Sequence, residues 1–406
     1  MLISFVDLLK KSKYNKVFRR IYYFIKNLPY LFAYIFSQKR TIKQNGLLLF
    51  VHDLERQGTQ TLIYNIAKKF ISMNINVCVI SPKIGPYWSD FVAVVPLIIA
   101  KGKKLERLVK VLKEYYGYNK AICNSVMTIE AIPILKKYDY RVISLIHEMN
   151  MFITEQNLAQ KCRDILPKVD LVIFPSTIVY KSFCDNCVKD GFKYQIRNQG
   201  LYNEKLANIN LEQARKWIIN HFGFDSDVKI ITNGANASYI KGFDYFLDIA
   251  YIAKNKFPNY KFLWIGKNAE TIFNEKLKQY NLKKFDNVIL PGYVSDLEIL
   301  NRLYAGSDLF LLTSRQDSFP SVVLEAFMVK KPVIAFENCG GFQDIVNNNI
   351  TGYLVKKFDT EECLDQISRL LSDKELMKSM GEKCRKVAEK HSFKNYCKYL
   401  LQILNN

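Results

Sequence analysis

The chain has 406 residues, of which 49% are hydrophobic, and its formal net charge is +21 at pH 7. This length and apolar content exclude wholesale disorder and favour two domains with large cores. The positive charge favours anionic partners, and charge alone does not choose between nucleic acid, anionic lipid and phosphorylated substrates. The nine cysteines are scattered and odd in number, as expected of reduced cytosolic thiols and not of a disulfide framework.

Residues 1–45 form a basic, aromatic extension with a single acidic residue, Asp7. Its cations are Lys10, Lys11, Lys13, Lys16, Arg19, Arg20, Lys26, Lys39, Arg40 and Lys43. Its apolar runs are interrupted before they reach the roughly 20 residues that a membrane-spanning helix needs. Aromatic and basic residues together suit the surface of an anionic membrane, so we expect a cytoplasmic protein held peripherally on the inner face. The alternative is a packed helical extension with a solvated basic face.

Residues 46–200 alternate short apolar runs with amphipathic segments, a pattern typical of a parallel sheet covered by helices on both faces. The predicted strands are 46–52, 76–80, 119–123, 140–147 and 170–175, and the predicted helices are 59–73, 105–115 and 128–137. We therefore expect a Rossmann-like N-terminal domain.

Residues 201–227 lose this rhythm and are interpreted as a connector, after which residues 228–390 repeat the pattern and a helix follows at 391–406. The predicted strands are 228–234, 260–266, 287–292, 308–314, 332–336 and 352–355, and the predicted helices are 243–256 and 322–331, with a helical tail from residue 360. The fold class is therefore α/β, with two doubly wound parallel sheets. Open sheets of this kind bind ligands at the carboxyl ends of their strands, so a central cleft is expected to hold the ligand.

The strongest motif is SDLFLLTSRQDSFPSVVLEAFMVKKPVIAF, at residues 307–336. Here a strand ends at Leu312, Asp317 lies in the following loop, and Pro320 is placed to begin a helix that contains Glu325. Both carboxylates then face the mouth of the second domain. Carboxylates are strong acceptors for paired hydroxyl groups, so the arrangement suits a ligand with two vicinal diols, such as a nucleotide sugar.

This segment resembles the E-x7-E motif of glycosyltransferase family 4, because seven residues separate Asp317 from Glu325. Four further segments resemble that family in the same order along the chain. They are FVHDLERQGTQTL, LIHE, NGANASYIKGFDYFLDIA and CGGFQDIV. The resemblance implies the two-domain GT-B fold and a retaining transferase that moves a hexose from a nucleotide-diphosphate sugar to a glycan or lipid-linked glycan acceptor.

The resemblance also implies roles for individual residues. Asp317, His147 and Lys241 would lie at the reacting sugar and diphosphate. The donor would be bound by Gly58, Gly234, Lys241, Gly292, Tyr293, Val294, Arg315, Ser318, Phe319 and Glu325. Gly58 and His147 also have plainer interpretations, as a turn glycine and a hydrogen-bonded histidine at a strand end.

The sequence departs from the family pattern at several positions. No arginine stands before Lys241 in GANASYIKG, so Lys241 would act alone or with Arg56 or Arg315. Aspartate replaces glutamate at 317 and 344, and an alignment shifted by one residue places Gln316 at the first position. An inactive relative is therefore an open alternative.

The expected chemistry places positive charge on the sugar and negative charge on the departing diphosphate, which cations and helix N-termini can stabilise. No metal or cofactor is therefore expected. The resemblance further implies attack on the same face of the sugar, with a donor phosphate oxygen helping to take the acceptor proton, so no protein nucleophile is expected. Asp225 and Asp227 form a D-x-D string that is interpreted as a solvated turn, and the Cys184 and Cys187 pair lacks the other ligands of a zinc site.

Two other classes of protein are disfavoured. A dinucleotide-dependent dehydrogenase would need a G-x-G-x-x-G loop after the first strand, and HDLERQGTQTL lacks it. A nucleic-acid-binding protein would explain the charge, but no recognised binding module is present. A non-catalytic nucleotide-sugar-binding or scaffold protein of the same fold is the remaining alternative.

Overall fold

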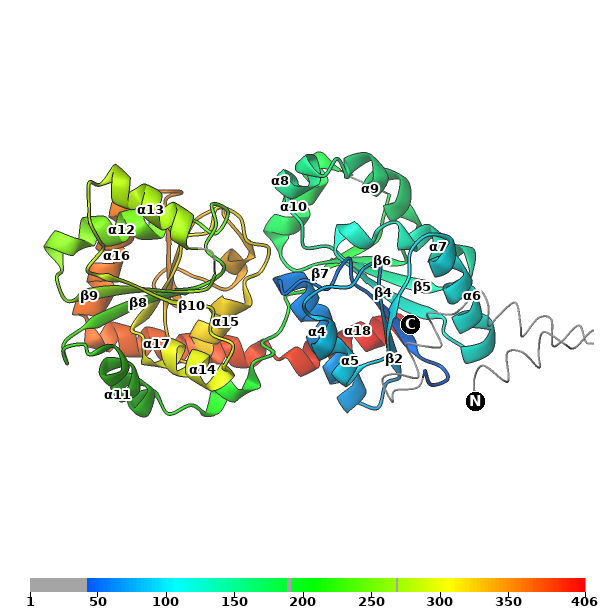
Figure 1. The fold of residues 1–406 in the computed structure, drawn as a ribbon, viewed down its shortest axis with the longest axis horizontal. Coiled ribbons are helices and arrows are strands. Elements are labelled where there is room, and N and C mark those ends of the chain that lie inside the picture. The colour runs from blue at the N-terminus through cyan, green and yellow to red at the C-terminus, as the bar shows by residue number, and fades with distance from the viewer. Residues whose placement is uncertain (1–41, 188–190, 268, 406) are drawn as a thin grey trace, which may run out of the picture. The chain divides into compact units, whose positions relative to one another are not determined.

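The structure is a computed structural model and describes residues 42–187, 191–267 and 269–405. Two entirely parallel sheets organise this part of the chain, one of seven strands and one of six (Figure 1). The predicted α/β class with two doubly wound sheets is confirmed. The basic extension falls almost entirely on residues 1–41, outside the described residues, and among the described helices none is long and apolar enough to cross a membrane.

The first sheet has the strand order β3-β2-β1-β4-β5-β6-β7. Its strands are β1 (Leu47–Phe50), β2 (Val77–Ser81), β3 (Leu97–Ile99), β4 (Lys120–Asn124), β5 (Arg141–Leu145), β6 (Leu171–Phe174) and β7 (Tyr194–Ile196). The central strands are buried over nearly their whole length because helices cover both faces, which explains their continuous apolar runs. The sequence missed β3 and β7, which are only three residues long.

Helices α4 (Gly58–Ser72) and α5 (Trp88–Val94) cover one face of this sheet, and α6 (Lys103–Tyr116) and α7 (Ala131–Lys137) cover the other (Figure 1). The segment between β5 and β7 adds α8 (Asn150–Glu155), α9 (Ala159–Ile165) and α10 (Thr177–Asn186), and short 3-10 turns lie at Val126–Thr128 and Leu166–Lys168. The predictions of α4, α6 and α7 are confirmed to within a few residues.

The second sheet has the order β10-β9-β8-β11-β12-β13. Its strands are β8 (Lys229–Gly234), β9 (Tyr260–Ile265), β10 (Val288–Gly292), β11 (Leu309–Leu312), β12 (Val333–Phe336) and β13 (Gly352–Val355). Every one of them was predicted. Because all the strands are parallel, the loops after β8, β10 and β11 leave the sheet at the same edge, and this edge carries most of the predicted site.

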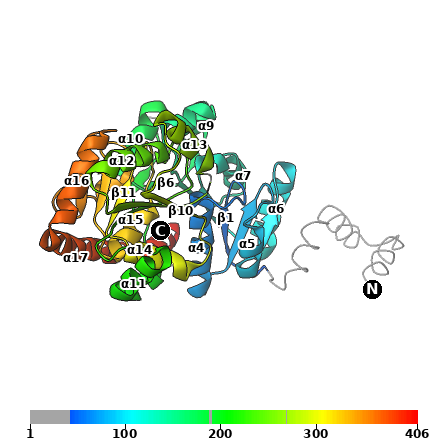
Figure 2. The same cartoon turned by 60° about the vertical axis from the view of Figure 1, so that its left-hand side comes forward.

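Helices cover both faces of the second sheet (Figures 1 and 2). On one face lie α12 (Phe243–Lys256), α13 (Glu270–Gln279) and α16 (Thr360–Ser372). On the other lie α11 (Leu211–Phe222), α14 (Leu297–Gly306), α15 (Ser321–Met328) and α17 (Lys374–Lys390), and α18 (Phe393–Asn405) ends the described chain. 3-10 turns lie at Glu204–Asn208 (η3) and Gly341–Asp344 (η4).

The segment interpreted as a connector contains a helix of the second domain. In α11, Ala214 and Ile218 are buried in the second core, and the Arg215 guanidinium donates to the Gly306 carbonyl and to Asp308 at 3.0 and 2.9 Å. The helix caps itself, because the Asn210 side chain accepts from the Gln213 amide. Between β7 and β8 the described chain contains no strand, which is why the alternation of strands and helices is interrupted in this segment.

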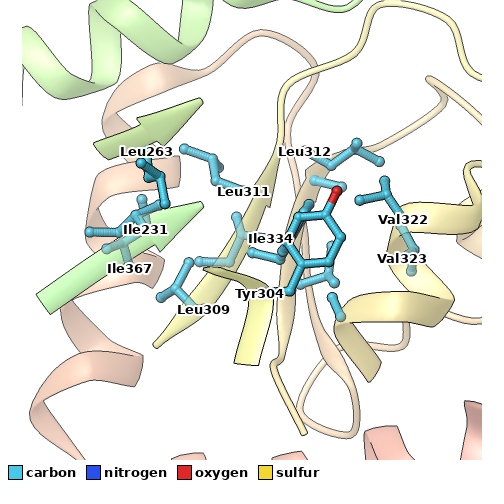
Figure 3. Close-up of a cluster of buried hydrophobic side chains, with 14 of the residues drawn as sticks. Ile231, Leu263, Tyr304, Leu309, Leu311, Leu312, Val322, Val323, Ile334 and Ile367 are labelled. Carbon is cyan, nitrogen blue, oxygen red and sulfur yellow. The ribbon is translucent and has the colours of Figure 1, made fainter. Parts of the chain in front are cut away.

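The core of the second domain lies on both faces of its sheet. Figure 3 shows Ile231, Leu263 and Ile367 packed together, with Tyr304 and Val323 in the same apolar cluster. The Tyr304 hydroxyl points toward the side chains of Leu312 and Val322 (Figure 3). This places a polar atom at the end of the sheet where β11 finishes.

Candidate functional site

The loop that carries Asp317 is fixed by backbone contacts. The Asp317 amide donates to the Cys339 carbonyl, and the Asp317 carbonyl accepts from the Gly341 amide, both at 2.9 Å. A Cβ atom on Gly340 would lie 2.3 Å from the Asp317 carbonyl oxygen, and one on Gly341 would lie 2.0 Å from that of Ser318. The two glycines therefore let the backbone after β12 pack directly behind the acidic loop.

Lys241 reaches the same loop from the segment between β8 and α12. Its Nζ lies 2.5 Å from Asp317 Oδ2, and the Asp317 side chain is only 9% exposed. The next residue, Gly242, has φ +66°, and a Cβ there would lie 1.8 Å from the Thr313 carbonyl oxygen. Only glycine satisfies both conditions, so the lysine-glycine pair is placed by a close backbone approach between the loops after β8 and β11.

Gln316 makes no corresponding contact. Its side chain is half-buried, whereas Asp317 is buried against Lys241, and the Ser314 hydroxyl adds a contact of 3.4 Å to the same Oδ2. Of the two possible alignments, the geometry favours the one that places Asp317 at the head of the seven-residue spacing.

Glu325 is a buried carboxylate without a hydrogen-bond donor among the described residues. It lies on α15, which begins after Pro320 as predicted, and the residue is 9% exposed. Burial raises the pKa of Glu325 to about 7. A buried carboxylate normally has a partner, so this one is well suited to accept hydroxyl groups from a ligand.

Tyr304 of α14 lies beside Glu325 and was not predicted. Burial is the main cause that raises the pKa of its hydroxyl well above the usual value, and the charge of Glu325 is the second. A Cβ at Gly234 would lie 2.2 Å from this hydroxyl. Gly234 thus makes room for Tyr304, which is a structural role that its place in the motif did not reveal.

Arg315 is already paired within the chain. Its two terminal nitrogens donate to the two oxygens of Asp244 at 2.7 and 2.6 Å, and its guanidinium lies 3.6 Å from the centre of the Tyr239 ring. Its Nη1 also donates to the Tyr239 carbonyl at 2.6 Å. These contacts tie the loop after β11 to the start of α12, so Arg315 holds the frame in which Lys241 and Asp317 meet.

The loop after β10 presents free backbone groups at the same edge of the sheet. Gly292 has φ +76°, and within the described residues no backbone hydrogen bond involves Tyr293 or Val294. Tyr293 is 52% exposed, and Lys267 Nζ lies 4.4 Å from the centre of its ring. An exposed ring with a cation beside it can pack against a planar group of a ligand.

The amides of Ser318 and Phe319 point to a similar use of the backbone. Neither donates to another residue in the described ranges, although Phe319 itself is buried. They precede the first turn of α15, whose own amides add to a positive end of the helix. The loop therefore offers donors next to the acceptors Asp317 and Glu325.

The remaining predicted residues, Gly58 and His147, belong to the part of the chain that forms the first sheet and its helices. Gly58 begins α4, and a Cβ added there would meet no atom within 4 Å, so packing within the chain does not require glycine. His147 follows β5, is 7% exposed, and its Nδ1 lies 3.0 Å from Gln199 Nε2. Arg56 is paired with Asp90 at 2.5 Å.

No group of three or more potential metal ligands occurs in the described parts of the chain. Asp225 and Asp227 are exposed and come just before β8 begins, at the sheet edge opposite to Lys241. Cys184 lies in the last turn of α10 and Cys187 follows the helix directly, and among the described residues neither forms a disulfide bond.

Comparison with known proteins gives these features a family context. Residues 215–387 match the family model described as "Glycosyl transferases group 1". This segment is a glycosyl transferases group 1 domain. It contains Lys241, Asp317, Glu325 and the loops that hold them, so the resemblance inferred from the motifs is confirmed at the level of this family.

Curated relatives match over part of their length. An uncharacterized glycosyltransferase of Haemophilus influenzae is 28% identical over 160 residues, which are 39% of this chain and 44% of that protein. The N-acetyl-alpha-D-glucosaminyl L-malate synthase of Bacillus anthracis is 38% identical over 105 residues, 26% of either chain. The chain thus spans less than half the length of either of these two relatives.

Solved structures match nearly the whole chain and show its fold. Anabaena HepE, solved in complex with UDP and glucose, has a TM-score of 0.73 at 15% identity, covering 89% of this chain and 100% of that one. A glycosyltransferase from Rickettsia africae has a TM-score of 0.73 at 20% identity and covers 89% and 98%. With its two parallel sheets, the chain has the predicted GT-B fold.

Proposed function

We propose that this chain is a glycosyltransferase that binds a nucleotide-diphosphate sugar at the carboxyl edge of its second sheet. The observation that carries the proposal is the buried carboxylate of Glu325, which has no donor among the described residues and lies on the helix that follows the Lys241 and Asp317 pair. Membership of residues 215–387 in the group 1 family and the UDP bound to Anabaena HepE support the same ligand class.

Each group then has a chemical task. Glu325 accepts the two ribose hydroxyls, and Asp317 accepts hydroxyls of the transferred sugar, because a carboxylate binds a vicinal diol through both oxygens. The Lys241 ammonium stabilises the departing diphosphate. The amides of Ser318 and Phe319 and the start of α15 add donors without needing a metal ion.

The reaction class follows from the resemblance to family 4. We propose retention at the anomeric carbon, by attack of the acceptor hydroxyl on the face from which the diphosphate leaves. A phosphate oxygen takes the acceptor proton, so the bond to the diphosphate breaks as the new glycosidic bond forms. His147 and Gly58 of the first sheet serve this step as a contact to the sugar and as room for the diphosphate.

The acceptor is proposed to be a glycan or lipid-linked glycan of the cell surface. The basic extension at residues 1–45 would hold the protein on the inner face of an anionic membrane, with about 1 kcal/mol from each cation near the surface. This assignment rests on the sequence, since almost all of these residues lie outside the described chain.

Calorimetric binding of UDP and GDP to the purified chain tests the donor assignment. Glu325→Ala is expected to weaken nucleotide binding by about tenfold or more, since it removes acceptors for two hydroxyls. Asp317→Ala is expected to lower transfer more than nucleotide binding. Asp365→Ala, on the exposed side of α16, is the matched control and should change neither.

The outcomes separate the alternatives. Equal nucleotide affinity in the parent and the Glu325→Ala chain would contradict the role of Glu325. Tight nucleotide-sugar binding without hydrolysis or transfer to any glycan would instead favour a non-catalytic sugar-nucleotide-binding protein of this fold.

A further inference from the structure

A groove of about 480 Å³ lies in the second domain, apart from the carboxylates of the proposed donor site. Its walls are η3, the first half of α11 and the first half of α14. Four side-chain amides line it, and we call it the amide groove. They are Asn208, Asn210, Gln213 and Asn301.

Asn301 is a buried amide that faces this groove. It is 5% exposed, and its Oδ1 accepts from Asn203 Nδ2 at 2.8 Å. Within the described chain its Nδ2 has no hydrogen-bond acceptor, and the Oδ1 of Asn203 behind it is buried without a donor. Buried amides normally satisfy these groups, so the pair leaves hydrogen-bonding capacity for a ligand.

The groove has the chemistry of a carbohydrate site and not of a phosphate site. Its guanidinium, Arg302, is already 2.5 Å from Glu298, which leaves Lys205 as the unmatched charge among the lining residues. Amides both donate and accept, as hydroxyl groups do. Trp217 supplies a fixed apolar wall, because His221 stacks on its ring at 4.6 Å and Arg302 lies 5.6 Å from it.

Helix α14 joins the groove to the proposed donor site. One turn after Asn301 it carries Tyr304, whose hydroxyl is close enough to Glu325 for the charge of that carboxylate to raise its pKa, and which lies 2.2 Å from where a Cβ of Gly234 would be. Tyr202 precedes Asn203 in the sequence, and its hydroxyl donates to Ser321 Oγ of α15 at 3.0 Å. The groove therefore lies beside the helices on one face of the second sheet, near the carboxyl ends of its strands where the donor site is proposed.

We propose that the amide groove binds a neutral oligosaccharide, as a second subsite for sugar residues remote from the one that reacts. Its use in transfer rests on the proposed function, whereas binding itself does not. Contacts that are equal in the ground and transition states lower KM without raising kcat. A second contact also raises the effective concentration of a long acceptor. The groove should therefore favour long acceptors over short ones.

The test uses the full chain labelled for indole NMR, with maltotriose, cellotriose, mannotriose and chitotriose as separate probes. The chain has three tryptophans. Only Trp217 lines the groove, and buried Trp264 donates its Nε1 to the Ala235 carbonyl. At least one probe should shift the Trp217 indole signal with millimolar affinity and leave the Trp264 signal in place. No Trp217 shift with any of the four would overturn the proposal.

Variants identify the surface that binds. Asn208 and Gln213 are exposed, so the double change Asn208→Ala and Gln213→Ala should preserve the fold and weaken binding by about tenfold. Asn301→Asp keeps the acceptor for Asn203 and removes the donor, and it should weaken binding similarly. Asn220→Ala, exposed on α11 outside the groove, is the matched control and should bind like the parent. Unchanged affinity in the double variant and in Asn301→Asp would refute the groove as the site.

Nucleotide binding separates this proposal from the proposed function. The double variant should bind UDP and GDP as tightly as the parent. Asn208 lies on η3 and Gln213 on α11, and neither belongs to the loops that hold Lys241 and Asp317 or to the helix that holds Glu325. If the chain binds an oligosaccharide but no nucleotide, the proposal for the amide groove is supported and the proposed transferase function is refuted. If the chain binds a nucleotide but none of the oligosaccharides, only the proposal for the amide groove is refuted.

Discussion

Protonation of Glu325 should couple the stability of the second domain to pH. Burial raises its pKa from 4.5 to about 7, so the folded chain holds a proton that the unfolded chain has released between these pH values. The free energy of unfolding therefore contains a favourable contribution below pH 4.5 that is lost as the pH rises to 7. A difference of about 2.5 in pKa, at 1.36 kcal/mol each, corresponds to about 3 kcal/mol.

Glu325→Gln removes this titration and keeps the shape of the side chain. Urea unfolding of both proteins from pH 4.5 to 8, without nucleotide, should show the variant gaining stability relative to the parent by about 3 kcal/mol as the pH rises. The matched control is Glu382→Gln, because the hydrogen bond from Lys330 lowers the pKa of exposed Glu382 and reverses the sign. If the difference in free energy of unfolding between the parent and Glu325→Gln stays constant over this pH range, Glu325 is not a buried carboxylate without a partner.

Three further predictions test the site and the extension. Calorimetry of UDP should show affinity falling below pH 7 in the parent and not in Glu325→Gln, because only the ionised carboxylate accepts both ribose hydroxyls. Gly242→Ala should lower the free energy of unfolding by about 1–3 kcal/mol in urea, from its left-handed backbone alone, whereas Gly58→Ala should not lower it. Deletion of residues 1–43 should reduce cosedimentation with anionic vesicles in a salt-sensitive way, and unchanged binding would exclude the membrane role.

The meeting of Lys241 and Asp317 was predictable because each follows a strand of one parallel sheet. The carboxyl ends of β8 and β11 lie at one edge, and these strands are neighbours in the sheet. The helix that holds Glu325 was predictable from Pro320 and the apolar run after it. Local pattern and strand order therefore fix these three positions.

Other parts of the site depend on contacts that no local pattern encodes. The sequence suggests Arg315 as a second cation for the diphosphate. In the structure Asp244 and the Tyr239 ring hold it, and this pairing exists only after the two loops meet. Tyr304 looks like one more core residue of an amphipathic helix. Its hydroxyl fits near Glu325 only because Gly234, at the end of β8, has no side chain to occupy that space.

The spacing of the family motifs has a common physical origin in backbone contacts. Gly242 admits the Thr313 carbonyl, and Gly340 and Gly341 admit the carbonyls of Asp317 and Ser318, so three chain segments touch without side chains between them. A longer residue at any of these glycines would separate Lys241 from Asp317 before it changed either charged group. The glycines are therefore as necessary to the 2.5 Å ion pair as the lysine and aspartate themselves. This is why widely separated motifs occur together: they are the touching parts of one support for the carboxylates.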